Sequence, residues 1–155
     1  MNANTEVLNS LREPAYSPEV TPAPPAPPIP LEELTPLAMQ WFDETRALSF
    51  DGVGITRESY GESESAAARL LTQYAEQEGL HVTADHAANL IFSLPDSDDR
   101  TPAIWVGSHL DSVPHGGNYD GLAGIVAGLL CLVDQRRNGR PSRHQLKVIA
   151  LRGEE

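Results

Sequence analysis

A loop rich in glycine, histidine and aspartate constrains the fold more strongly than any other feature of the sequence. It runs from Gly107 to Gly121 and reads GSHLDSVPHGGNYDG. It follows the apolar run Ala103–Val106 and precedes an apolar segment that we expect to begin a helix near Leu122. Ligands of α/β proteins bind outside the carboxyl ends of parallel strands, so such a fold places its chemistry in a loop of this kind.

The sequence that follows this loop predicts a strand–helix–strand unit. A helix is expected over Leu122–Val133, and Gly124 and Gly128 lie one turn apart, which lets its backbone approach a sheet closely. The apolar run Leu146–Leu151 follows as a second strand, parallel to the first, in a right-handed βαβ unit. Neither strand alternates with polar residues, so we expect both to be buried. The predicted class is α/β, with helices packed on a mostly parallel central sheet.

The two strand ends bring one imidazole and several carboxylates together. His109 offers a ring nitrogen, Asp120 a carboxylate that can bridge two ions, and Glu155 a further carboxylate. This mixed donor set suits zinc, manganese, cobalt or nickel, and differs from a cysteine-rich structural zinc site. Asp111 is placed to accept the second imidazole N–H, and Glu154 to deprotonate a metal-bound water, whose pKa the metal lowers to about 7. The sequence therefore predicts half of a metal-hydrolase centre.

These residue types also have more ordinary interpretations. A histidine at a strand end is usually hydrogen-bonded without a metal, and a Glu-Glu pair usually lies on the surface. His115 either faces the cavity or lies exposed in a loop. The remaining histidines are interpreted as structural: His81, His86 and His144.

The rest of the chain divides at about residue 30. Residues 1–30 are interpreted as a disordered, proline-rich N-terminal tail, because the run TPAPPAPPIP favours an extended polyproline conformation. The tail is either a solvated spacer or a ligand of a proline-recognising domain. The elements expected next are a helix over Leu31–Leu48, a loop over Phe50–Gly61, a helix that Ser63 or Ser65 caps and Gly79 ends, and short strands over Leu80–Thr83 and Asn89–Leu94.

Composition excludes several classes of function. A formal net charge of −11 argues against binding to nucleic acid or to anionic membranes, both of which need a basic surface. No apolar stretch approaches the roughly 18 residues of a membrane span, and no signal sequence is evident, so we expect a cytoplasmic protein. The only cysteine, Cys131, lies in an apolar helical run and is expected to be a buried, inert thiol.

The metal-site residues carry a resemblance to a known family. The segments GSHLDSVP (107–114) and GGNYDG (116–121), followed by Glu154-Glu155, resemble the dinuclear zinc hydrolases related to aminoacylase and carboxypeptidase G. The most similar branch is the hydantoinase/carbamoylase amidases, which includes N-carbamoyl-L-amino-acid hydrolase, allantoate amidohydrolase and β-ureidopropionase. The short gap between Asp111 and Asp120 favours this branch over the peptidases, as do residues 54–57 and 85–90. The resemblance extends from about Leu31 to Glu155.

This resemblance implies an incomplete catalytic domain. Residues 31–155 would be the N-terminal part of a zinc-peptidase-like catalytic domain. His109 would bind one of two divalent ions, Asp120 would bridge both and Glu155 would bind the second, with Glu154 as general base and Asp111 as partner of His109. The family's further ligands, and a second domain that provides homodimer contacts and binds the substrate, would lie beyond Glu155.

The resemblance also implies a reaction. The complete enzyme would hydrolyse a C–N bond of small N-carbamoyl or ureido amino acids, whereas the isolated chain would be inactive. The alternatives are an aminoacylase-like or dipeptidase-like zinc hydrolase, and a non-catalytic, truncated metal-binding or interaction fragment.

Overall fold

A computed structural model describes residues 27–98, 100–139 and 144–155 of the chain. Most of the proline-rich tail, residues 1–26, lies outside the described residues, so its predicted disorder stays a prediction. The described elements, in chain order, are α2 (Leu31–Ser49), β1 (Ile55–Arg57), α3 (Glu62–Gln77), β2 (His81–Ala84), β3 (Leu90–Ser93), β4 (Ala103–His109), β5 (Ser112–Gly116), α4 (Leu122–Asn138) and β6 (Gln145–Leu151).

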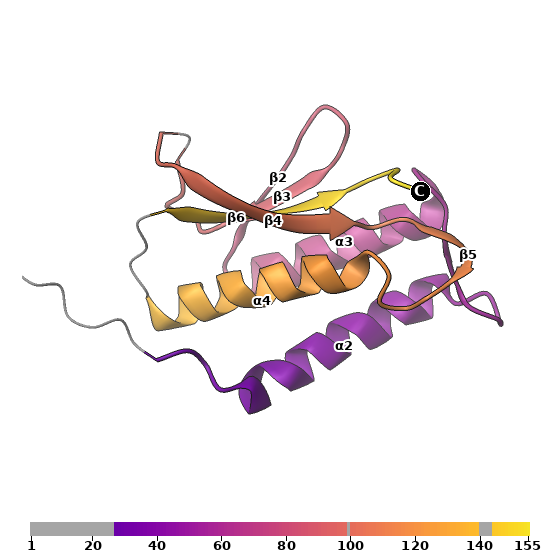
Figure 1. The fold of residues 1–155 in the computed structure, drawn as a ribbon, viewed down its shortest axis with the longest axis horizontal. Coiled ribbons are helices and arrows are strands. Elements are labelled where there is room, and N and C mark those ends of the chain that lie inside the picture. The colour runs from indigo at the N-terminus through magenta and orange to yellow at the C-terminus, as the bar shows by residue number, and fades with distance from the viewer. Residues whose placement is uncertain (1–26, 99, 140–143) are drawn as a thin grey trace, which may run out of the picture.

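The described elements form three layers. A four-stranded sheet of order β2-β3-β6-β4 lies above α3 and α4, and α2 packs beneath these two helices (Figure 1). The stacked rings of Trp41 and Tyr74, with centroids 5.4 Å apart, join α2 to α3. Both side chains are buried, so Trp41 serves to pack the two helices together.

The sheet confirms the α/β class and contains the expected parallel pair. β4 and β6 are parallel and in register from Ala103↔Gln145 to His109↔Leu151, with α4 between them in the sequence. The other two pairings, β2 with β3 and β3 with β6, are antiparallel, so the described sheet is mixed rather than mostly parallel. The register places the end of β4 directly beside the end of β6.

Two glycines of α4 allow the helix to approach the sheet, as the sequence predicted. A Cβ atom at Gly124 would lie 2.9 Å from Cβ of Ser108, and one at Gly128 would lie 2.9 Å from both methyl groups of Val148. Real Cβ atoms do not approach other atoms so closely, so the two glycines permit the short distance between α4 and the sheet. The core residues Ile125, Leu129 and Leu132 of the same helix are fully buried.

The expected loop over Phe50–Gly61 proves to contain a strand. β1 pairs antiparallel with β5 in a separate two-stranded sheet. The close approach depends on Gly54, where a Cβ would lie 2.5 Å from the carbonyl group of His115. Neither strand was predicted, because β1 has only three residues and β5 contains a proline, which usually interrupts a strand.

The predicted cap of the second helix was also wrong. α3 begins at Glu62 after Gly61, and no side chain caps it. Instead, Oε2 of Glu64 accepts a hydrogen bond of 2.6 Å from the main-chain N–H of Tyr60. This bond fixes the chain just before the helix, but it does not replace the serine cap that the sequence suggested, because Tyr60 precedes α3.

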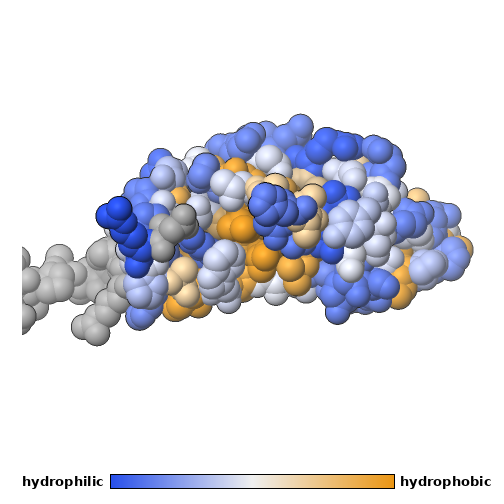
Figure 2. Space-filling view, turned by 90° about the horizontal axis from the view of Figure 1, so that it is seen from above, coloured by the Kyte–Doolittle hydropathy of each residue, from blue (hydrophilic) through white to orange (hydrophobic). Residues whose placement is uncertain are grey.

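One face of the sheet is not covered by the described helices. Figure 2, which shows this side of the molecule, displays apolar side chains in its centre. The expectation that Ala103–Val106 is buried on both faces was wrong, because β4 is the edge of the sheet that the described strands form: Ile104, Trp105 and Val106 are 55 %, 51 % and 39 % exposed. Trp105 is covered only in part, by Lys147 on the neighbouring strand, whose Nζ lies 5.5 Å from the ring centroid.

Cys131 is exposed, which corrects the expectation of a buried thiol. It lines an apolar groove of about 440 Å³ between α2, α4 and the segment that precedes α2. The apolar run around Cys131 suggested burial, but this residue lies on the side of α4 that faces the groove.

We expect Cys131 to react with Ellman's reagent in the native chain without denaturant. A Cys131→Ser variant provides the blank, and a thiol that reacts only after unfolding would contradict this prediction.

Candidate metal centre

The parallel register brings the ends of β4 and β6 together at His109. The N–H of Leu110 donates a 2.8 Å hydrogen bond to the carbonyl oxygen of Leu151, which extends the pairing by one step beyond the strands. The chain then turns at Gly153, whose φ is +70°, and places Glu154 and Glu155 near the imidazole. Residues that are distant in sequence therefore meet at one edge of the sheet.

The ligand atoms around His109 are close enough to share an ion. One ligand atom from each of His109, Glu154 and Glu155 lies within 4.8 Å of the others, and these three form the possible metal-binding group among the described residues. Nε2 of His109 lies 4.0 Å from Oε2 of Glu154 and 3.8 Å from Oδ1 of Asp120. Asp120, a predicted ligand, lies beside this group without being part of it. Glu154, the predicted base, is one of the three residues whose atoms could bind the ion.

The other ring nitrogen of His109 faces Asp111. Nδ1 lies 3.1 Å from the main-chain oxygen of Asp111 and 3.5 Å from its carboxylate Oδ1. A proton on Nδ1 therefore has an acceptor, which leaves the lone pair of Nε2 directed toward the carboxylates. The nearer acceptor is the main-chain oxygen, whereas the sequence had suggested only the carboxylate.

Asp111 is a buried carboxylate that its neighbours keep charged. Its Oδ2 accepts hydrogen bonds of 2.6 Å from the hydroxyl of Ser59 and 2.9 Å from the N–H of Glu155. Burial alone would raise the pKa of Asp111, but these hydrogen bonds outweigh burial and hold the pKa below its usual value. Asp111 therefore connects three segments: the loop before α3, the end of β4 and the end of the chain.

A buried arginine beneath the site escaped the sequence analysis. Arg57 in β1 is fully buried, and its Nε donates a 2.7 Å hydrogen bond to the carbonyl oxygen of Leu110. Burial lowers the pKa of Arg57, while the charges of Asp111 and Asp120 act in the opposite direction. An arginine in a predicted loop normally points to solvent, and residues 54–57 entered the prediction only as part of the family resemblance, with no role for Arg57.

His115 takes the exposed position that was one of its two interpretations. Its side chain is 59 % exposed, and Nδ1 lies 2.7 Å from Oδ2 of Asp51. Hydrogen bonds from the N–H groups of Gly54 and Val53 and from the hydroxyl of Thr56 hold the pKa of Asp51 well below its usual value. The other three histidines in the predictions, His81, His86 and His144, are exposed and lie outside the group around His109.

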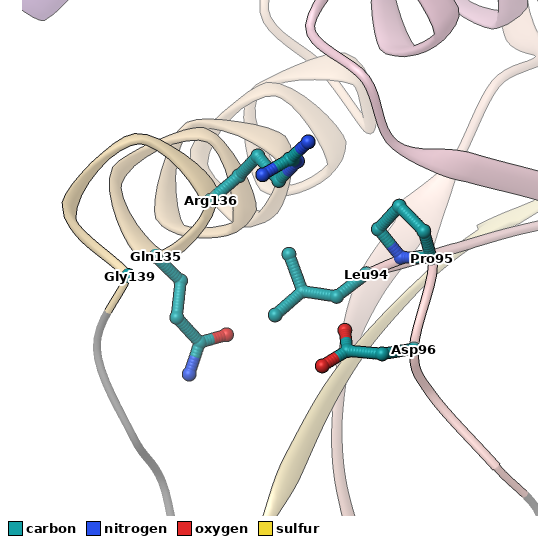
Figure 3. A pocket seen from close by; sticks show the side chains of 6 residues that line it. All are labelled: Leu94, Pro95, Asp96, Gln135, Arg136 and Gly139. Atoms are coloured by element: carbon teal, nitrogen blue, oxygen red, sulfur yellow. The ribbon is translucent and has the colours of Figure 1, made fainter.

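A separate cavity lies at the opposite end of α4. It measures about 310 Å³ and is formed by the segment after β3 and the last turn of the helix (Figure 3). Its lining residues are Leu94, Pro95, Asp96, Gln135, Arg136 and Gly139. His109 precedes the N-terminal end of α4, so this cavity is not part of the candidate metal centre.

Among the described residues, no helix has the length and apolar character needed to cross a membrane.

Comparisons with known proteins agree on one group of enzymes. No family model matches the chain. An N-carbamoyl-L-amino-acid amidohydrolase of Paenarthrobacter aurescens is 38 % identical over 112 residues, covering 72 % of this chain and 27 % of that protein. A ureidoglycolate hydrolase of Oryza sativa is 30 % identical, covering 74 % of this chain and 24 % of that protein. The crystal structure of a hydantoinase/carbamoylase family amidase from Burkholderia multivorans superposes with a TM-score of 0.69 at 25 % identity, covering 83 % of this chain and 30 % of that one.

The two relatives by sequence are named an amidohydrolase and a hydrolase, and the solved structure is named an amidase. Within this class, the chain is a homologue of the hydantoinase/carbamoylase amidases, which confirms the predicted resemblance. It spans about a quarter of the length of the curated relatives that it matches.

Proposed function

We propose that the chain supplies part of the catalytic centre of a metal-dependent amidohydrolase that acts on a C–N bond of N-carbamoyl or ureido amino acids. The observation that carries this proposal is the cluster of His109, Glu154 and Glu155 at the paired ends of β4 and β6. The relatives named N-carbamoyl-L-amino-acid amidohydrolase and ureidoglycolate hydrolase support the substrate class. A small-molecule substrate and homodimerisation through a further domain are part of the same proposal.

The donor set fits two divalent ions of the zinc, manganese, cobalt or nickel group. His109 would bind one ion through Nε2, Glu155 would bind the second, and Asp120, 3.8 Å from Nε2, would bridge them. Such ions would polarise the scissile carbonyl group and make water more acidic. The proton on Nδ1 of His109, accepted by Asp111, would keep the imidazole in the tautomer that presents Nε2 to the ion.

Glu154 is proposed to move the proton. Its carboxylate is exposed, lies 4.0 Å from Nε2 of His109 and accepts no hydrogen bond from His109 at that distance. It would take the proton of the attacking water and deliver it to the leaving nitrogen. This role differs from that of Glu155, whose main-chain N–H is fixed by Asp111.

The matched pair Glu154→Gln and Glu155→Gln tests these roles. In a protein that carries the full length seen in the relatives, Glu154→Gln should lower turnover by about 10²–10⁴-fold and leave the metal content nearly unchanged. Glu155→Gln should lower the metal content, because it removes a charged ligand. Metal content is measured by atomic absorption and turnover by ammonia release. An equal loss of metal in both variants would show that Glu154 is a ligand rather than the base.

Substrate profiling separates the proposal from its alternatives. Faster turnover of N-carbamoyl than of N-acetyl amino acids supports the carbamoylase assignment, and the reverse order favours an aminoacylase-like enzyme. A protein that binds no divalent ion in calorimetric titration would contradict the metal centre and favour a non-catalytic interaction fragment.

A further inference from the structure

A buried ion pair lies next to the candidate metal centre and was not predicted. Oε2 of Glu64, in the first turn of α3, accepts a hydrogen bond of 2.9 Å from Nε of Arg152, which directly follows β6, and forms an ion pair with Nη2 of the same guanidinium at 2.8 Å. The Glu64 side chain is 0 % exposed and that of Arg152 is 13 % exposed. The two residues are 88 positions apart in the sequence. The pair therefore ties the start of α3 to the segment that carries Glu154 and Glu155.

Further contacts leave the pair little freedom. The Glu64 carboxylate also accepts hydrogen bonds from the N–H groups of Tyr60, at 2.6 Å, and Gly153, at 3.3 Å. Nη2 of Arg152 donates to the hydroxyl of Ser65 at 2.8 Å, and the guanidinium lies 5.1 Å from the centroid of the Tyr60 ring. Charged hydrogen bonds of this kind are directional, so they fix the path of the main chain at Arg152 and Gly153.

The same loop also holds the other side of the centre. Ser59 donates to Asp111, which accepts the N–H of Glu155 through the same oxygen, Oδ2. Residues 59–64 thus hold Arg152 and Gly153 through Glu64, and hold Glu155 through Ser59 and Asp111. The segment with the two glutamates is fixed before and after Glu154.

We propose that Glu64 is a positioning residue that sets the placement of Glu154 and Glu155 through Arg152. This inference rests on the proposed metal centre and adds a residue that does not touch substrate or metal. A buried ion pair is a weak source of stability compared with apolar residues of the same size. Its saturated geometry directly before the two glutamates is better explained by the orientation that it imposes on them.

The test compares Glu64→Gln with Glu62→Gln. Both variants remove one negative charge from the first turn of α3, but Glu62 is exposed and forms a surface ion pair with Arg69. The first readout is amide hydrogen exchange of Glu155, which needs no metal. Glu64→Gln should speed exchange at Gly153 and Glu155 but not at Val148 within β6, whereas Glu62→Gln should change neither. Exchange at Glu155 that stays unchanged, or rises equally at Val148, would overturn the proposal.

The second readout connects positioning to the metal. In Co²⁺ titrations of the full chain, followed by visible absorption, Glu64→Gln should weaken affinity by about 10–100-fold and alter the band shape, because it disturbs ligand orientation. A double variant, Glu64→Leu with Arg152→Leu, replaces the pair by apolar side chains. If it remains folded and binds Co²⁺ weakly, positioning is supported; if it binds Co²⁺ as the parent does, the proposal is wrong. A parent chain that binds no Co²⁺ would contradict the metal centre, while the exchange experiment would still decide the role of Glu64.

Discussion

Replacement of Gly107 with alanine should destabilise the chain by about 4 kcal/mol or more, which is at the upper end of single-residue effects. A Cβ atom at this position would lie 2.1 Å from the carbonyl oxygen of Ile149 and 2.6 Å from its Cγ2. Gly107 and Ile149 face each other in the parallel pairing, so β4 and β6 would have to separate or shift. Urea denaturation followed by circular dichroism measures the decrease in the free energy of unfolding, and the slope of the transition reports whether unfolding remains cooperative.

Gly117→Ala is the matched control for this variant. The nearest atom to a Cβ at Gly117, apart from its chain neighbours, is Cβ of Asp120 at 4.0 Å, and its φ is not positive. The two substitutions add the same methyl group within one segment, but only one of them meets a neighbouring strand. Equal stability of the Gly107→Ala and Gly117→Ala variants would contradict the parallel register of β4 and β6.

Replacement of Asp111 with alanine should lower both stability and metal affinity. The change leaves the part-buried N–H of Glu155 and hydroxyl of Ser59 without their acceptor, which costs about 3 kcal/mol for two hydrogen bonds to a charged group. It also removes the carboxylate beside Nδ1 of His109. The free energy of unfolding is measured by urea denaturation and the affinity by calorimetric titration with Zn²⁺. Asp120→Ala removes an exposed carboxylate near the same histidine and should weaken only the binding of metal.

The stability contributed by Asp111 should depend on pH with a definite sign. The pKa of Asp111 is lower in the folded chain than its ordinary value, so its contribution is fully present above the unfolded pKa of about 3.9. It is lost as the pH falls from there through the folded pKa. The difference in unfolding free energy between parent and Asp111→Ala should therefore shrink below about pH 3.9. A difference that grows on acidification would contradict the charged state of Asp111.

The sequence predicted the main elements because their patterns are local. Apolar spacing located α2, and the apolar runs located β4, α4 and β6 to within a few residues. Parallel pairing across α4 follows from the length of the connection, and this alone brought His109 and Glu155 together in the prediction. The ligand roles of these residues remain predictions.

The features that the sequence did not predict depend on contacts between distant residues, which no local pattern shows. Arg57 and Glu64 are charged residues in a predicted loop and a predicted helix end, where such residues usually face solvent, and their burial follows from partners 53 and 88 positions away. Cys131 and Trp105 show the opposite error: both were expected to be buried and both are exposed. An apolar run does not reveal which of its faces neighbouring elements cover. Burial of single residues, unlike the elements themselves, is decided by tertiary packing.

The parallel pairing of β4 with β6 has a consequence for the order of folding. Antiparallel neighbours such as β2 and β3 are joined by a short turn, whereas the bond between Asp111 and Glu155 closes a loop of 44 residues that includes the whole of α4. Closing such a loop costs chain entropy that local contacts do not repay. We therefore expect the helices and the β2–β3 hairpin to form first and the metal ligands to assemble in a late step. A ligand ion added during refolding should then slow unfolding more than it speeds folding.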